Sequence, residues 1–209
     1  MSRIFCIVGK SGSGKDTLYH KILSESRPNL IPVIPYTTRP KRSEEEDGVN
    51  YFYVTEKQLE EYERQERIIE KRQYQTVQGI WSYFTVRFDI QEDCDYLLIT
   101  TLEGVQGLLK HYDKDLVHVV YLNLDEKIRL LRCIERESQQ AAPDYAEVCR
   151  RYLADQEDFS PKNLSVFAHF HEICTDASTD DCLKQWNKIL EEEQRVACDS
   201  FAPERNAQH

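Results

Sequence analysis

The 209 residues are 40% hydrophobic, so the chain is long enough to bury a core and too apolar to be disordered. A formal net charge of −10 argues against broad contact with nucleic acid or anionic membranes, so a bound anion needs a local basic cluster. Seven cysteines without a C-x-x-C pair favour reduced thiols over disulfides or a cysteine-bound metal. The sequence shows no signal peptide and no membrane-spanning run, so we expect a cytoplasmic protein.

The first motif is a glycine-rich turn between a predicted buried strand (residues 4–8) and a predicted helix (residues 16–22). It reads G-K-S-G-S-G-K-D-T and contains the G-x-x-x-x-G-K pattern of a phosphate-binding loop. Glycines let backbone N–H groups converge on an anion, and the helix N-terminus adds partial positive charge. We expect nucleotide phosphates to contact Gly9, Ser11, Gly12, Ser13, Gly14, Lys15, Asp16 and Thr17.

Two positions of this loop carry specific chemistry. Lys15 is expected to reach the β- and γ-phosphates of the nucleotide. The motif usually continues with a Ser or Thr that holds Mg²⁺, but here Asp16 follows the lysine and the hydroxyl comes at Thr17. We predict that Asp16 and Thr17 are the metal ligands. The alternative is that Asp16 only stabilises the start of the helix, as aspartate does at helix N-termini.

The next part of the chain is rich in strands. Residues 30–34 predict a short strand, and the charged segment 35–50, with two prolines and an Asp-Gly pair, predicts a loop. A strand is expected at 51–54, and Thr55 with Gln58 forms a capping box that opens a helix to about residue 66. Residues 68–77 and 80–86 predict a hairpin. Residues 36–86 therefore predict a small strand-rich insert.

The remaining chain alternates between strands and helices. Strands are predicted at 96–101, 117–122 and 172–174, and helices at 104–111, 125–137, 144–159 and 179–194. Such alternation is typical of an α/β protein with a doubly wound parallel sheet, in which the phosphate loop follows the first strand. Residues 198–209 look like a frayed tail without function.

A second basic cluster lies in the charged loop. Arg39 and Arg42 are three residues apart, and Tyr51 follows nine residues later. Guanidinium groups bind phosphate oxygens with two hydrogen bonds, and a tyrosine adds a hydroxyl, so the cluster is suited to a second phosphate group. The adjacent acidic run 44–47 equally allows a solvated surface loop. The charge pattern alone does not decide between the two.

The sequence resembles the guanylate kinase family along nearly its whole length. That family has a T-T-R-x-x-R-x-x-E-x-x-G-x-x-Y segment, which the chain matches with Thr37, Thr38, Arg39, Arg42, Glu45, Gly48 and Tyr51. Further matches are Ile68-Ile69-Glu70, Leu102-Glu103-Gly104-Val105, the pair Arg132 and Arg136, and the pair Arg150 and Glu157. The resemblance implies a single domain of P-loop NTPase type. Its parts are a core (1–35, 87–131 and 155–195), a nucleoside-monophosphate-binding insert (36–86), a helical lid (132–154) and a frayed tail (196–209).

The resemblance also implies an activity, the transfer of the γ-phosphoryl group of ATP to GMP or dGMP in the presence of Mg²⁺. In it Arg39, Arg42 and Tyr51 bind the acceptor phosphate, and Glu70 accepts two hydrogen bonds from guanine. Three arginines are expected to close on the transferring phosphoryl group, namely Arg132, Arg136 and Arg150. Together with Lys15 they are the expected catalytic residues. We expect small-molecule nucleotides as the only partners, no nucleic acid or membrane, and a monomer or homodimer.

The chain departs from the family pattern at three places. Pro35 replaces a serine that helps to read the base, and Ile99-Thr100-Thr101 replaces an Asp-x-Asp that serves Mg²⁺ and guanine, which leaves Thr101 as the base contact. Ile80-Trp81-Ser82-Tyr83 stands where the family has Tyr-Tyr-Gly-Ser, so either Trp81 or Tyr83 takes the place of the phosphate-binding tyrosine. Two alternatives to a GMP kinase therefore stay open. One is a non-catalytic guanylate-kinase-like binding module, and the other is a kinase of the same mechanism with a different or modified nucleotide as acceptor.

Overall fold

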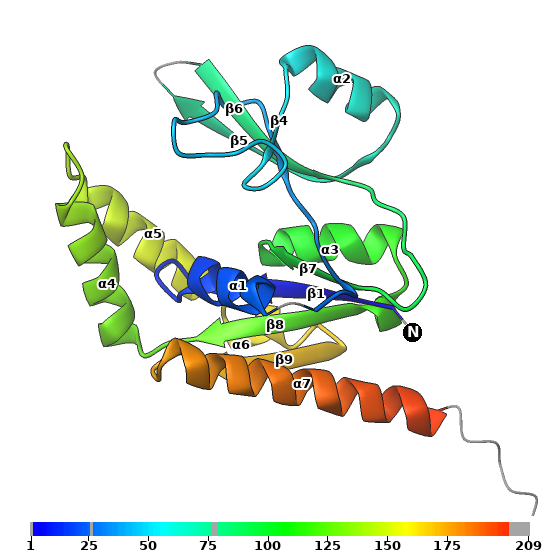
Figure 1. Cartoon of the computed structure of the whole chain (residues 1–209). Helices are drawn as coiled ribbons and strands as arrows, with labels where there is room; N and C mark the ends of the chain where they lie inside the picture. Colours follow the sequence, from blue (N-terminus) through cyan, green and yellow to red (C-terminus); the bar gives the residue numbers. More distant parts are fainter. Residues whose placement is uncertain (1, 26, 77–78, 201–209) are drawn as a thin grey trace, which may run out of the picture.

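The computed structural model describes residues 2–25, 27–76 and 79–200 of the chain. Its larger part is a five-stranded sheet in the order β2–β7–β1–β8–β9, in which every strand is parallel to its neighbours (Figure 1). The strands are β1 (Arg3–Val8), β2 (Leu30–Pro32), β7 (Asp95–Ile99), β8 (Val117–Asn123) and β9 (His169–Cys174). The predicted α/β fold with a parallel sheet is confirmed.

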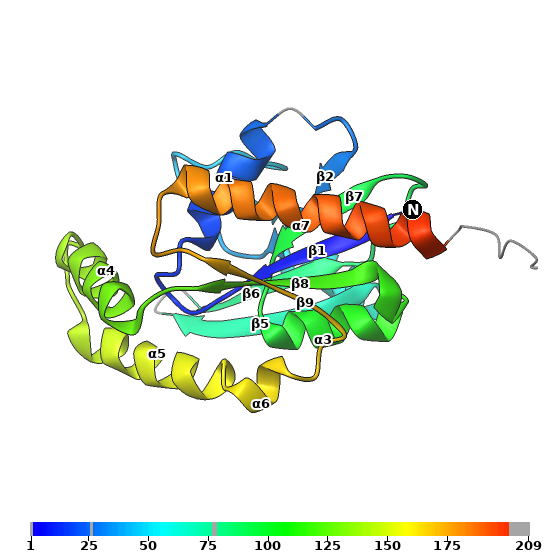
Figure 2. The same cartoon turned by 90° about the horizontal axis from the view of Figure 1, so that it is seen from below.

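Helices cover both faces of this sheet, with α1 and α7 on one side and α3 and α6 on the other (Figure 2). Phe5 and Ile7 of β1 pack in the cluster that includes α1 and α7. Ile4 and Cys6, which point the other way, pack in the cluster that includes α3. Because both faces are covered, β1 is apolar at successive positions. The elements are α1 (Lys15–Ser24), α3 (Leu102–His111), η1 (Lys114–Leu116), α6 (Pro161–Leu164) and α7 (Thr179–Ser200).

The predicted insert forms a separate four-stranded sheet above the core, in the order β4–β3–β6–β5 (Figure 1). Leu59 of α2 packs with Phe84 and Val86 of the sheet to form its small hydrophobic core. The capping box at Thr55 is present, with Oγ1 accepting from the Gln58 backbone N–H. The elements are β3 (Tyr36–Thr37), β4 (Phe52–Tyr53), α2 (Glu56–Arg64), β5 (Ile68–Thr76) and β6 (Gly79–Val86).

Two neighbouring helices, α4 (Glu126–Ser138) and α5 (Tyr145–Asp158), project from the core on the side of α1 (Figure 1). Asp125 and Asp144 cap their N-termini: the Asp125 side chain accepts from two backbone N–H groups of the first turn, and the Asp144 side chain accepts from one. The pair agrees to within one residue with the helices predicted at 125–137 and 144–159. That residues 132–154 form a mobile lid stays a prediction.

The C-terminal region differs from the prediction. Helix α7 continues through Ser200, so the expected frayed tail is wrong for residues 196–200, which are helical. The charged stretch before them favours helix, and the sequence has no glycine or proline there to end it. The remainder of the predicted tail, 201–209, lies outside the described residues. Among the described residues, no helix combines the length and the apolar character that crossing a bilayer requires.

Candidate active site

The phosphate-binding loop follows the carboxyl end of β1 and leads directly into α1, as its motif predicts. Gly12 and Gly14 have φ of +83° and +90°, in the left-handed region that favours glycine. At Gly12 a Cβ atom would also lie only 2.8 Å from Sγ of Cys133 on α4. The loop can therefore lie close to α4 only because this position lacks a side chain.

Lys15 bends back over its own loop. Its Nζ donates to the carbonyl oxygens of Gly9 at 2.6 Å and Lys10 at 3.0 Å. Burial lowers the pKa of Lys15, and the nearby carboxylates Asp16 and Asp155 oppose that shift. The ammonium is thus held at the loop, where phosphate oxygens would take over as its partners.

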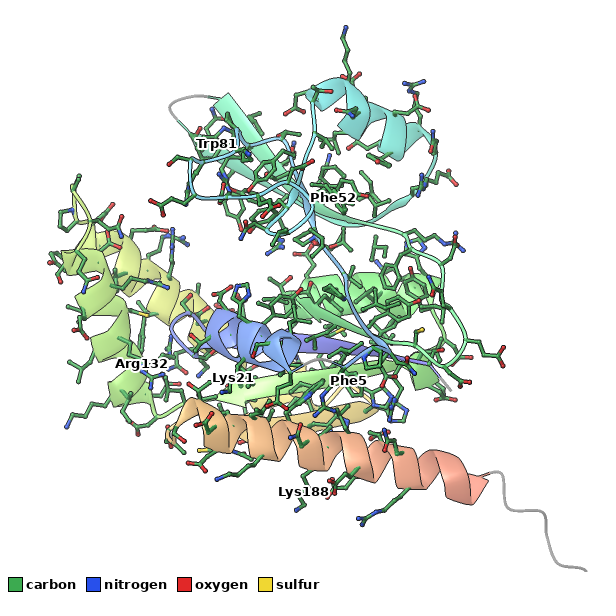
Figure 3. All side chains as sticks on the ribbon, viewed as in Figure 1. Phe5, Lys21, Phe52, Trp81, Arg132 and Lys188 are labelled. Atoms are coloured by element: carbon green, nitrogen blue, oxygen red, sulfur yellow. The ribbon has the colours of Figure 1, made fainter. Side chains whose placement is uncertain are left out.

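A cavity of about 510 Å³ opens in front of the loop, within the size range of small-ligand pockets. Arg132 and Arg136 of α4, both exposed, lie in its wall, and Figure 3 shows Arg132 on that helix. The two predicted lid arginines and the loop therefore share one pocket. Its lining consists of Ser11, Gly12, Ser13, Gly14, Lys15, Asp16, Thr17, Leu18, Arg132, Arg136, Thr175, Ala177, Thr179 and Cys182.

The third predicted lid arginine is elsewhere. Arg150 is exposed on α5 and is paired with Glu147, with Nε to Oε2 at 2.6 Å and Nη2 to Oε1 at 2.8 Å. It does not line the cavity described above. Its role at the transferring phosphoryl group stays a prediction that requires α5 to move.

On the insert, Arg39 is buried and fixed from several sides. Nη1 and Nη2 donate to the Glu45 carboxylate at 3.0 and 2.7 Å, Nη1 also donates to the Pro40 carbonyl, and Nε donates to the Tyr83 hydroxyl at 3.1 Å. The ring centroid of Tyr51 lies 5.6 Å from Cζ. The hydrogen bonds to Glu45, Pro40 and Tyr83 occupy four of the five N–H groups of Arg39, one on Nε, two on Nη1 and one on Nη2.

Glu45 is the residue that holds Arg39. Its hydrogen bond with Arg39 lowers the pKa of the Glu45 carboxyl to about 2, so it stays ionised at neutral pH. It also accepts from the backbone N–H of Arg42 at 2.9 Å, whose own side chain is exposed. Arg42 can therefore reach a ligand, whereas Arg39 is already positioned.

The structure distinguishes between Trp81 and Tyr83. Tyr83 contacts Arg39, and its ring centroid lies 5.7 Å from that of Tyr51. Trp81 lies two residues closer to the start of β6, opposite Tyr74 of β5 (Figure 3). Tyr83 therefore joins the predicted phosphate cluster, and Trp81 does not.

Glu70 lies on the same sheet with its side chain only 7% exposed. Its Oε1 accepts from the Thr85 hydroxyl at 3.0 Å, and its Oε2 from Nε of Arg72 at 3.2 Å. Thr85 is the cross-strand partner of Glu70 in β6. The sequence did not identify Arg72 or Thr85, because only the hairpin register, which includes an irregularity between residues 68 and 70, places them on either side of this carboxylate.

Thr101 has a structural role in addition to the predicted one. Its Oγ1 accepts from the Gly104 backbone N–H at 3.1 Å and so caps α3. The adjacent Thr100 Oγ1 is buried and has no hydrogen-bond partner within the described part of the chain. A contact between Thr101 and a base stays a prediction.

A buried network under the phosphate loop was not predicted. Arg129 of α4 is fully buried and pairs with Glu126 at 2.8 Å and with Asp155 of α5 at 3.1 Å. Burial raises the pKa of Glu126, but hydrogen bonds from Lys10, Arg129 and Tyr152 outweigh it and bring the pKa to about 2. Charged residues of an amphipathic helix normally indicate a solvated face, so no sequence signal marked this network.

The phosphate-binding loop follows the first strand of a parallel sheet and faces an arginine-lined pocket. This arrangement defines the class of P-loop nucleotide-binding α/β proteins. Residues 1–193 match the family described as Guanylate kinase, and the chain belongs to that family. It is 33% identical over 141 residues to a guanylate kinase of Thermotoga maritima, covering 65% of this chain and 67% of the relative. A guanylate kinase of Novosphingobium aromaticivorans is 29% identical over 90% of this chain and 80% of its own.

A solved structure agrees in fold. The crystal structure of guanylate kinase from Anaplasma phagocytophilum matches with a TM-score of 0.58 at 18% identity, covering 92% of this chain and 86% of that one. At this identity the likeness concerns the fold alone. The family resemblance of the sequence is nonetheless confirmed, because it rests on the match over residues 1–193.

Proposed function

We propose that this chain is an ATP-dependent guanylate kinase that transfers the γ-phosphoryl group of ATP to GMP or dGMP, giving ADP and GDP or dGDP. The observation that carries the proposal is the shared pocket, in which an intact phosphate loop faces Arg132 and Arg136. Membership of the guanylate kinase family supports the same activity. Phosphoryl transfer depends mainly on positioning and charge stabilisation, so no strong base is required.

On the donor side, backbone N–H groups of the loop and the N-terminus of α1 bind the phosphates of ATP. Lys15 exchanges the carbonyls of Gly9 and Lys10 for phosphate oxygens, which are better partners for an ammonium group. Arg132 and Arg136 then neutralise charge that develops on the transferring group. Arg150 joins them when the lid of residues 132–154 closes.

The residues present fit Mg²⁺. Asp16 and Thr17 are exposed in the first turn of α1 and line the pocket, so a carboxylate and a hydroxyl oxygen are available for a cation that prefers oxygen ligands. Asp16 thus supplies a carboxylate where the core strand offers Ile99. When bound, Mg²⁺ neutralises charge on the β- and γ-phosphate oxygens.

On the acceptor side, the insert of residues 36–86 binds the nucleoside monophosphate. Arg42, the remaining N–H of Arg39, and the hydroxyls of Tyr51 and Tyr83 bind its phosphate. Glu70 accepts from the two adjacent donors of guanine, because each carboxylate oxygen can accept more than one hydrogen bond. Trp81 and Thr101, proposed contacts from the sequence, lack such support from their placement.

The test is to mix the chain with Mg²⁺-ATP and GMP and to measure both products. Equal amounts of ADP and GDP, absent with Lys15→Ala, are expected. A binding module would bind GMP in calorimetry, ignore ATP and form no GDP, and the missing strand aspartates make this the competing function. A cytoplasmic location and a monomer or homodimer belong to the proposal as well.

A further inference from the structure

A second group of chemically capable side chains lies at the opposite end of the core from the phosphate loop. His118 is on β8, His171 on β9 and Glu193 on α7, which lies along these strands (Figure 2). The register of β1 with β8 places His118 opposite Phe5, near the start of β1, whereas the phosphate loop follows the end of that strand. The group is therefore separate from the nucleotide site.

The three side chains bring one possible ligand atom each to within 4.8 Å of the others. Nδ1 of His118 is 3.4 Å from Nε2 of His171 and 3.6 Å from Oε2 of Glu193. Nε2 of His171 is 3.3 Å from Oε1 of Glu193. Ligand atoms about 2.05 Å from a tetrahedral Zn²⁺ are about 3.3 Å from one another. The separation of the two imidazole nitrogens, and the distance from each of them to its nearest Glu193 oxygen, lie within about 0.3 Å of that value, with the two histidines facing different oxygens of the carboxylate.

Hydrogen bonding alone explains the group less well. The separations of 3.4 and 3.6 Å around His118 exceed the distances of good N–H···N and N–H···O bonds, which are about 2.7–3.2 Å. Burial lowers the pKa of both His118 and His171, so both imidazoles are neutral near pH 7, as metal ligands must be. A buried neutral pair beside a carboxylate is a suitable environment for a divalent cation.

We propose that His118, His171 and Glu193 form a binding site for Zn²⁺ or a similar divalent transition metal, with a fourth position open to water. Two imidazole nitrogens and one carboxylate oxygen are a donor set that suits Zn²⁺, whereas Mg²⁺ and Ca²⁺ prefer oxygen alone. The cation joins α7 to β8 and β9. It stabilises the core and takes no part in phosphoryl transfer.

His169 is the neighbour that stands outside the site. It lies opposite His118 in the strand register, with ring centroids 4.6 Å apart, and its Nε2 is 3.7 Å from Oδ1 of Asp115. Its ring therefore borders the site without completing it. Removing His169 is expected to weaken the metal less than removing His171.

The experiment uses the tag-free full chain, freed of metal with EDTA and dialysed into buffer with excess Mg²⁺. Zn²⁺ titrated by calorimetry is expected to bind at one ion per chain and to raise the thermal midpoint. His171→Ala and Glu193→Ala are expected to weaken binding by about 100-fold or more. His20→Ala, which removes an exposed histidine on α1, is the matched control and is expected to bind as the parent does.

Two further readouts keep the result decisive. Circular dichroism of the metal-free variants establishes that each is folded before titration, and His171→Asn replaces His171→Ala if the latter is not. Co²⁺ in place of Zn²⁺ is expected to give a tetrahedral visible spectrum without a thiolate charge-transfer band. No stoichiometric binding, binding unchanged in both ligand variants, or a thiolate band from the cysteines would overturn the proposal.

Discussion

The backbone N–H of Ser11 in the phosphate loop donates to Oδ2 of Asp155 in α5 at 2.8 Å, across 144 residues of sequence. The same oxygen accepts from Nη1 of Arg129, which also donates to the Ser11 carbonyl at 3.4 Å. The loop, α4 and α5 therefore share one ion-pair network around a buried guanidinium. The network fixes α4, which carries Arg132 and Arg136, against the phosphate-binding loop.

Asp155→Ala is expected to lower the free energy of unfolding by about 1–3 kcal/mol, because it removes one partner of a fully buried guanidinium. Urea unfolding of the purified chain measures this. Asp158→Ala, an exposed aspartate on the same helix, is the control and should leave the midpoint unchanged. Equal midpoints for both variants would show that the ion-pair network does not stabilise the fold.

Lys15→Ala is expected to lower kcat by at least about 10²–10³-fold while the fold is kept, because the ammonium contacts the transferring phosphoryl group. Steady-state rates with saturating ATP and GMP provide the measurement. Lys188→Ala removes an exposed lysine on α7 and should retain the parent rate (Figure 3). If Lys15→Ala changed KM alone, Lys15 would bind ATP without contributing to the chemical step.

Glu70→Gln is expected to reduce the preference for GMP over AMP in kcat/KM by about 10–100-fold, because the amide offers guanine one acceptor instead of two. Thr85→Val should have a smaller effect in the same direction, since it removes the hydroxyl that orients the carboxylate at 3.0 Å. Glu60→Gln on the exposed face of α2 is the control. An unchanged preference in Glu70→Gln would mean that another residue reads the base.

The lowered pKa of His118 predicts how the free energy of unfolding of the metal-free chain depends on pH. Burial, together with the neighbouring His169, His171 and Arg3, lowers its pKa from 6.5 to about 3. Between these values the unfolded chain binds a proton that the folded chain excludes, so the free energy of unfolding falls as the pH falls from 6.5 toward 3. Above pH 6.5 the residue is neutral in both states and contributes no pH dependence.

Urea unfolding in EDTA at pH 7.0, 6.0 and 5.0 measures this slope, expected to be at most about 1.4 kcal/mol per pH unit from one site. His118→Asn should flatten it. The charged and titratable groups that face His118 are Arg3 of β1, His169 and His171 of β9 and Glu193 of α7, and the backbone carbonyl of Asp115 accepts a hydrogen bond from its ring. A slope identical in parent and variant would show that folding does not lower the pKa of His118.

The local sequence predicted the parts of the fold and site that depend on local spacing. The phosphate loop was identified because its glycines, its lysine and its flanking strand and helix are contiguous, and the insert because of its capping box and hairpin. Tyr83 could not be separated from Trp81, since strand register decides which side chain meets Arg39. Arg129 was missed because its burial comes from packing against α5 and the loop.

The most direct test of the kinase assignment is a coupled ADP-release assay with Mg²⁺-ATP against GMP, dGMP, AMP, CMP, UMP and dTMP. We expect turnover concentrated on GMP and dGMP, and its loss in Lys15→Ala. Turnover on another monophosphate would contradict the guanine assignment of Glu70 and keep the mechanism. The absence of turnover with all six monophosphates would contradict the proposal that the chain is a nucleoside monophosphate kinase.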